Sequence, residues 1–345
     1  MVLNFTKAVL IWSLVLILFG CKQDKAPDVS HIEANMNIIR TEKALKNLKN
    51  VEELKLLKEK HPSFYKIYFS QVLGLTSEDN NSIFTAFEPF KNDSLTRDVL
   101  KIIEKRFTQD QFLQSDIQKM YQYLLYYFPD KLAVPNIYTF ISDFAYQIFI
   151  FEDDDKKDGI AIGLDMFLYP DIPYKKIDPD NTNFSDYITR AWNAEHISKK
   201  IADIHVADLI GEAPGHRLID QMIHNGKALY ITKLLLPEKH DSIIHEYTGA
   251  QMQFCVENEL QMWSFFFDQK LFFETNPTKI AKYIFPSPQS PDMPDDAPGR
   301  TANYIGWKIV TAFMERYPET TLEQLINLTD SQQLMEKSKY KPKQK

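Results

Sequence analysis

A strongly patterned segment in the middle of the chain, residues 185–237, constrains the fold more than any other stretch. It predicts two consecutive helices, residues 186–210 and 217–236, separated by a Gly-Glu-Ala-Pro-Gly breaker at 211–215. In the first helix, Ile197, Ile201 and Ile204 recur at three-to-four-residue spacing and form an apolar stripe. A stripe of this kind faces a core, so we expect this helix pair to be the organising element of the fold.

Short runs rich in β-branched and aromatic residues predict a small sheet on the N-terminal side of the helix pair. The expected strands cover residues 33–40, 137–142, 146–151 and 159–167. Helical spacing dominates residues 41–129, and it returns over 241–273, 301–317 and 321–328 around a proline-rich irregular loop at 283–299. The sequence therefore predicts an α+β, mostly helical fold in which a small sheet packs on helices.

Length and charge limit the classes of protein that fit. The chain has 345 residues, enough for one large core or two modest ones, and we expect one domain over 31–330. A formal net charge of −7 argues against a nucleic-acid-binding protein, which carries a basic surface. The C-terminal segment 331–345 is rich in lysine, and we expect it to be a basic disordered tail.

The N-terminus has the pattern of a lipoprotein signal peptide over residues 1–20. Lys7 precedes an apolar run at 8–19, which is too short to span a bilayer. Leu-Phe-Gly-Cys at 18–21 resembles a bacterial lipobox, which implies that Cys21 carries acyl chains such as palmitate and that 21–30 is a tether. The alternative is a free cysteine that ends an uncleaved anchor. Cys255 is the only other cysteine, so a lipidated chain has no intrachain disulfide.

A catalytic zinc site of the zincin type needs two histidines four residues apart on one helix face. His196 and His205 are nine residues apart and point in opposite directions, and Lys200 stands four residues after His196. The His245-Glu246 dipeptide has no second histidine four residues on. We expect surface or capping histidines, no catalytic residue, no metal ligand and no cofactor.

Several motifs, each weak alone, occur in order along the chain and together resemble one family. They are the lipobox Cys21, residues 135–142 (PNIYTFIS), 162–168 with 170–174, 218–230 (LIDQMIHNGKALY), 298–300 and 305–310. This combination resembles the gliding motility lipoprotein GldB family of the Bacteroidetes. The resemblance implies a lipoprotein of the cell envelope, anchored through Cys21 on the periplasmic side of the inner or the outer membrane. It also implies partners among the gliding motility and type IX secretion proteins.

The family is in turn distantly similar to gluzincin-type metallopeptidases, which implies a zincin-like domain. In those enzymes the third zinc ligand is a Glu that precedes Gly in the second helix, and here Asn225 stands at that position. The resemblance thus implies a pseudo-metallopeptidase that lacks both the paired histidines and this Glu. Aromatic residues are enriched at interfaces, so Trp263, Phe266, Arg300 and Trp307 are candidate contacts for protein partners. The alternatives are an active zinc peptidase with unconventional ligands and a lipoprotein that binds a small molecule or glycan.

Overall fold

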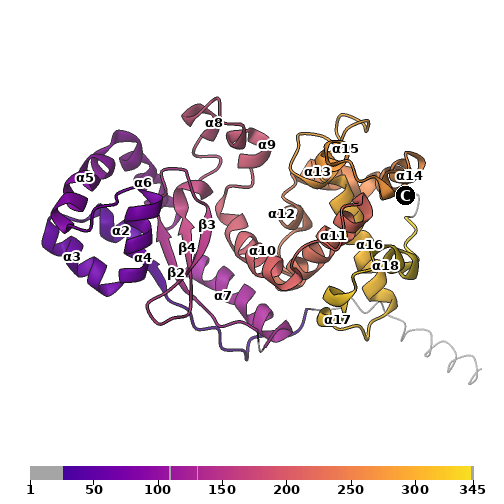
Figure 1. The fold of residues 1–345 in the computed structure, drawn as a ribbon, viewed down its shortest axis with the longest axis horizontal. Helices are drawn as coiled ribbons and strands as arrows, with labels where there is room; N and C mark the ends of the chain where they lie inside the picture. Colours follow the sequence, from indigo (N-terminus) through magenta and orange to yellow (C-terminus); the bar gives the residue numbers. More distant parts are fainter. Residues whose placement is uncertain (1–25, 109, 130, 343–345) are drawn as a thin grey trace, which may run out of the picture.

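A four-stranded sheet with the strand order β1-β2-β4-β3 lies between two groups of helices in the computed structural model, which describes residues 26–108, 110–129 and 131–342 (Figure 1). β1 (Ile38–Arg40), β2 (Asn136–Phe140) and β4 (Asp158–Gly163) run parallel, and β3 (Ile148–Glu152) pairs antiparallel with β4. The expected mostly helical α+β fold is confirmed. The first strand starts at Ile38 rather than at residue 33, and the last ends at Gly163 because a 3₁₀ turn, η3 (Leu164–Phe167), follows it.

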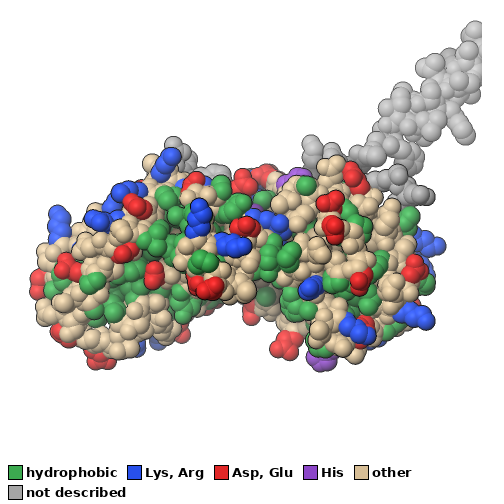
Figure 2. Space-filling view, turned by 90° about the horizontal axis from the view of Figure 1, so that it is seen from above, with side chains coloured by type: hydrophobic (Ala, Val, Ile, Leu, Met, Phe, Trp, Pro, Cys, Tyr) green, Lys and Arg blue, Asp and Glu red, His purple; other side chains and the backbone are tan. Residues whose placement is uncertain are grey.

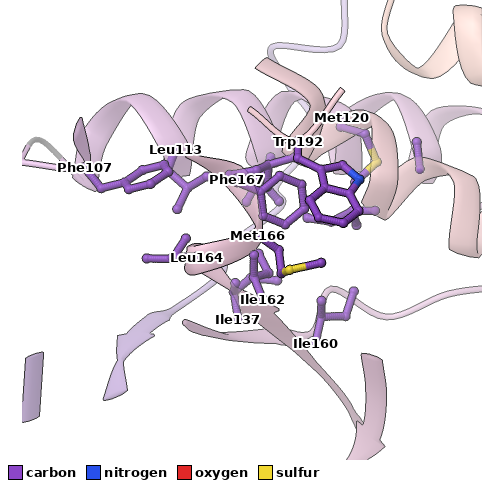
Figure 3. Packing of buried hydrophobic residues seen from close by; sticks show 14 of the residues in the cluster. Phe107, Leu113, Met120, Ile137, Ile160, Ile162, Leu164, Met166, Phe167 and Trp192 are labelled. Atoms are coloured by element: carbon purple, nitrogen blue, oxygen red, sulfur yellow. The ribbon is translucent and has the colours of Figure 1, made fainter. Parts of the chain in front are cut away.

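Helices cover both faces of the sheet. Because successive side chains of a strand point to opposite sides, the two central strands contribute buried side chains to both faces. Tyr138 and Phe140 pack with the N-terminal helices, and Ile160 and Ile162 pack on the other face with α7 (Asp110–Tyr127) (Figure 3). The N-terminal group consists of α2 (Thr41–Lys46), α3 (Val51–Lys60), α4 (Pro62–Ile67) with the π-turn η2 (Tyr68–Val72), and α5 (Asn80–Asn92); α6 (Ser94–Arg106) leads to α7.

The predicted helix pair is present as α10 (Ile197–Ile210) and α11 (Leu218–Leu235), but the first helix is shorter than expected. The short elements α8 (Tyr174–Ile177), η4 (Thr182–Phe184), α9 (Asp186–Thr189) and η5 (Ala194–His196) precede it. The prediction of one helix from residue 186 was wrong because Asn193 is extended and its side chain caps η5, accepting a hydrogen bond from Glu195 N at 3.0 Å. The neighbouring Trp192 is buried against Tyr174 and Phe184.

The C-terminal part of the chain forms a second core around α11 and α16 (Thr301–Arg316). Met222, Phe266, Ile305 and Ile309 are among its fully buried or nearly fully buried side chains, and the Cys255 thiol lies there too. The helices around this core are α12 (Asp241–His245), α13 (Gly249–Glu257), α14 (Glu259–Asp268) with η6 (Leu271–Phe273), α15 (Pro277–Ile284), α17 (Leu322–Asn327) and α18 (Ser331–Ser338).

The ends of the described chain are more ordered than expected. Val29 is only 4% exposed and packs in the core, although the tether was expected to run to residue 30. The tail predicted over 331–345 begins instead with α18, which Asp330 caps at Gln333 N and which buries Leu334. Within the described residues, no helix combines the length and apolar character needed to cross a bilayer. Cys21 lies outside the described residues.

Two glycines allow α11 and α16 to pack backbone against backbone. A Cβ on Gly306 would lie 1.9 Å from the Met222 carbonyl oxygen, and one on Gly226 would lie 2.3 Å from the Gly306 carbonyl carbon. Real Cβ atoms do not approach backbone that closely, so a side chain at either position requires the helices to separate. The absence of both side chains therefore sets the distance between the two helices.

We predict that Gly306→Ala lowers the free energy of unfolding by about 3 kcal/mol, because the added methyl group forces the packed helices apart. Urea denaturation followed by circular dichroism measures the loss. Gly249→Ala is the matched control, because nothing lies within 4 Å of its Cβ position in α13 and alanine favours helix there. Equal midpoints for wild type and Gly306→Ala would contradict the prediction.

Candidate functional site

A cleft of about 590 Å³ lies between the segment before α10 and the end of α12. Its lining residues include Tyr169, Tyr187, Arg190, His196, Glu246 and Tyr247. Size alone does not distinguish it, because a hollow beside Phe313 and Tyr317 has a volume of about 610 Å³. The cleft differs because the buried Glu246, the half-buried Arg190 and His196, whose Nε2 has no partner in the described chain, all line it.

Glu246 is the buried centre of a charge cluster, which comprises Lys199, Lys200, Asp203, Glu246 and Arg300. Its Oε1 accepts hydrogen bonds from Lys199 Nζ at 3.0 Å and lies 2.6 Å from Lys200 Nζ. Its Oε2 accepts from Arg300 Nη1 at 3.1 Å, and Lys199 also donates to Asp203 Oδ2 at 2.6 Å. Burial by itself would raise the pKa of Glu246, but the three neighbouring cations hold that pKa well below its usual range. The carboxylate is therefore ionised and joins α10, α12 and α16.

Glu246 and Arg300 both adopt left-handed backbone conformations, with φ of 55° and 64°. Glu246 is the C-cap of α12, and Arg300 is the N-cap of α16. For residues other than glycine this conformation costs about 1–2 kcal/mol each. Such backbone strain clusters at functional sites, where the surrounding contacts enforce it. Here the ion pair between the two strained residues holds the ends of both helices in place.

His196 and Arg190 have polar atoms in the cleft region that the fold leaves without partners. The Nε2 atom of His196 and the Nε atom of Arg190 are buried and make no hydrogen bond in the described chain. Burial, reinforced by Lys199 and Lys200, lowers the pKa of His196 to about 4, although Glu246 opposes the shift. Burial and the nearby Arg300 also lower the pKa of Arg190.

His245 lies next to the cluster in an aromatic setting. Its ring stacks on Tyr247 with a centroid distance of 5.6 Å and meets Trp307 edge-on at 4.9 Å. Burial, followed by repulsion from Arg300 and Lys199, lowers the pKa of His245 to about 3. The ring is therefore neutral in the folded protein near neutral pH.

The structure places the sequence-predicted residues in different surroundings. Arg300 belongs to the charge cluster, Phe266 is fully buried, and Trp263 is partly buried against Phe272 and Tyr340. Asn225 donates from Nδ2 to Asn303 Oδ1 at 2.9 Å. Cys255 is a buried core residue whose pKa burial raises to about 12, as expected for a structural thiol.

Sequence reasoning missed most of the cluster. The expectation of surface or capping histidines is confirmed for His240, which caps α12, but it was wrong for His196, His205 and His245, which are buried. Lys200 lies on the same helix face as His196, as the four-residue spacing requires, and it pairs with Glu246. In the residues that the structure describes, no three His, Cys, Asp or Glu side chains are grouped so that they could hold a metal ion.

Replacing Glu246 by Gln tests the charge cluster. We predict that Glu246→Gln lowers the free energy of unfolding by about 3 kcal/mol, because three cations lose their shared anion in a buried place. The control is Glu104→Gln, which removes one partner of the exposed pair with Lys46 and should cost less than about 1 kcal/mol. Similar losses for the two variants, measured by chemical denaturation, would contradict the prediction.

His245→Phe tests the effect of a buried neutral histidine on acid stability. The unfolded histidine gains a proton below pH 6.5, whereas folded His245 does so only near pH 3, so its contribution to stability is complete above pH 6.5 and is lost as the pH falls. We predict that, when the pH is lowered from 7 to 5, the free energy of unfolding of wild type falls by about 2 kcal/mol more than that of His245→Phe. Thermal or urea unfolding at both pH values measures this difference. The exposed His216 supplies the control variant His216→Phe, and parallel pH profiles for wild type and His245→Phe would count against the assignment.

Comparison with known proteins identifies the family of the chain. The model of the family described as gliding motility protein GldB matches residues 22–342. No curated protein and no solved structure matches the chain significantly. Because the family model covers nearly the whole chain, this protein belongs to the GldB family of gliding motility proteins.

Proposed function

We propose that this gliding motility lipoprotein acts as a non-catalytic component of the gliding machinery, built on a degenerate metallopeptidase scaffold. The main support is the charge cluster on α10. Lys200 stands where a zincin helix would carry its second histidine, and Lys199, Lys200 and Arg300 converge on Glu246. Three cations at this place repel a divalent metal ion, so the site is electrostatically unsuited to zinc.

The second helix of the pair supports the same proposal. Asn225 stands at the position of the third-ligand Glu in the gluzincin pattern, and its amide bonds to Asn303 of α16. An amide is a poorer zinc ligand than a carboxylate. The zincin-like domain that we propose covers residues 31–330 and also includes α18. It would keep the helix pair but would lack the zinc-binding residues and therefore the catalytic activity.

We further propose that acyl chains on Cys21 anchor the protein to the cell envelope on the periplasmic side, with partners among the gliding motility and type IX secretion proteins. The family match begins at residue 22, directly after Cys21. Exposed aromatic side chains support a binding role for the aromatic segment 263–273 and for the proline-rich loop 283–299. Phe267 of α14 is 67% exposed, Phe273 of η6 is 55% exposed, and Phe285 in the loop is 61% exposed.

We expect the purified protein to contain no stoichiometric zinc, and we expect Asn225→Ala to restore spreading to a gene-deletion strain as fully as wild type does. Metal analysis by mass spectrometry and colony spreading of a gliding bacterium are the measurements. One zinc ion per chain, or loss of spreading with a folded Asn225→Ala protein, would favour the active peptidase instead.

Cys21→Ala is the matched control in the same strain. It leaves the folded body unchanged but removes the proposed attachment point, so it should fail to restore spreading and should leave the membrane fraction. A deletion strain that spreads normally would count against a role in gliding altogether.

A further inference from the structure

Arg190 is the first element of an inference that goes beyond the proposed scaffold role. Its guanidinium lines the cleft but forms no hydrogen bond or ion pair with any described residue, and its Nε is buried. The carboxylate of Glu246, which opposes the lowering of the pKa of Arg190 by burial, is already shared by three other cations. Arg190 is half-buried, and a guanidinium that has lost part of its hydration without gaining a partner favours the binding of an anion.

The surrounding charge favours an anion in the cleft. In the ion-paired cluster three cations face two carboxylates, Glu246 and Asp203, and Arg190 adds a fourth positive charge. Asp186 also lines the cleft, but it is exposed to solvent. In the view from above, basic side chains lie near the middle of the molecule, at the level of α8 and α9, with acidic side chains among them, on a chain whose net charge is −7 (Figure 2). Counted together, the cluster, Arg190 and Asp186 give four cations against three carboxylates, so the surroundings of the cleft carry a small net positive charge in a chain whose overall charge is negative.

His196 adds a second requirement for the ligand. It lines the cleft, is only 5% exposed, and its Nδ1 lies 3.0 Å from Asn193 Oδ1. The orientation of the Asn193 amide is fixed, because its Oδ1 also accepts from Glu195 N and its Nδ2 donates to the Arg190 carbonyl oxygen at 2.9 Å. Nδ1 of His196 must therefore carry the hydrogen, and the neutral ring leaves Nε2 as an acceptor without a partner.

Asn193 positions both groups, since it contacts the backbone of Arg190 and the ring of His196. Tyr169, Tyr187 and Tyr247 line the same cleft and provide apolar wall. Its volume of about 590 Å³ is in the range of small-molecule sites. The cleft therefore combines the guanidinium of Arg190, which has no ion pair with the described residues, the Nε2 atom of His196, which accepts no hydrogen bond from them, and the faces of tyrosine rings. Together these groups fit a compact ligand.

We propose that this cleft is a binding site for a small hydroxylated organic anion. Arg190 holds the carboxylate or phosphate oxygens of the ligand, and a neighbouring hydroxyl group of the ligand donates its hydrogen to Nε2 of His196. The site would make this gliding motility protein a sensor or carrier of such a molecule, which the scaffold role alone does not require.

Calorimetric titration of the full chain, purified in a non-ionic detergent, tests the site with paired probes. Glycerate and glycerol 3-phosphate carry the hydroxyl group, whereas propionate and methyl phosphate lack it, so the four probes separate a carboxylate site from a phosphate site and isolate the role of His196. We expect at least one hydroxylated probe to bind with a Kd of about 1 mM or tighter. Its affinity should fall as salt rises, and its hydroxyl-free counterpart should bind at least tenfold more weakly.

Substitutions locate the binding. We expect Arg190→Gln to weaken binding at least tenfold, Arg190→Lys to keep part of it, and His196→Phe to remove the preference for the hydroxylated probe. The exposed Arg97 gives the matched control Arg97→Gln, which should bind like wild type. If Arg190→Gln does not fold, Arg190→Lys and His196→Phe still decide the outcome. No binding of any probe, or equal binding by wild type and the folded Arg190 variants, would overturn the proposal, whereas loss of gliding function alone would not bear on it.

Discussion

The close backbone contact between α11 and α16 is the constraint on which the C-terminal half depends. Because Gly226 and Gly306 carry no side chains, the two helices approach until main-chain atoms touch. That approach sets the position of α16 relative to α11, and Arg300 is the N-cap of α16. Arg300 in turn reaches Glu246 at the end of α12. The close packing of Gly226 against Gly306 therefore helps to place Arg300 where it can neutralise the buried carboxylate of Glu246.

The charge cluster links elements that are far apart in the sequence. Glu246 receives Lys199 and Lys200 from α10 and Arg300 from α16, so one carboxylate connects three helices around the cleft. Buried ion pairs contribute little net stability compared with apolar packing of the same volume, because desolvation offsets most of the attraction. Their effect is on specificity, since the observed arrangement of these helices brings all four side chains together. Beside this paired cluster, Nε of Arg190 and Nε2 of His196 remain without hydrogen-bond partners among the described residues, as does Nε2 of the neighbouring His245.

The sequence predicted the broad architecture better than the site, for physical reasons. The sheet was found because β2, β3 and β4 are short runs of β-branched and aromatic residues, and α10 and α11 were found from their spacing and the glycine–proline breaker. The break before α10 was missed because the apolar spacing of residues 186–210 does not show that Asn193 is extended and caps η5, or that Trp192 next to it is buried. α18 was missed because lysine content outweighed one buried leucine. Glu246 and Lys199 are 47 residues apart and locally unremarkable, so only the tertiary fold reveals their pairing.

Burial of Val29 sets how far the body of the protein can extend from a membrane. Val29 is eight positions after Cys21, and a fully extended chain of that length spans at most ~29 Å. In the lipid-anchored form that we propose, the point where the chain enters the folded body would stay within this distance of the bilayer surface. The body would then be held close to the membrane that carries the lipid, and a partner would meet it there.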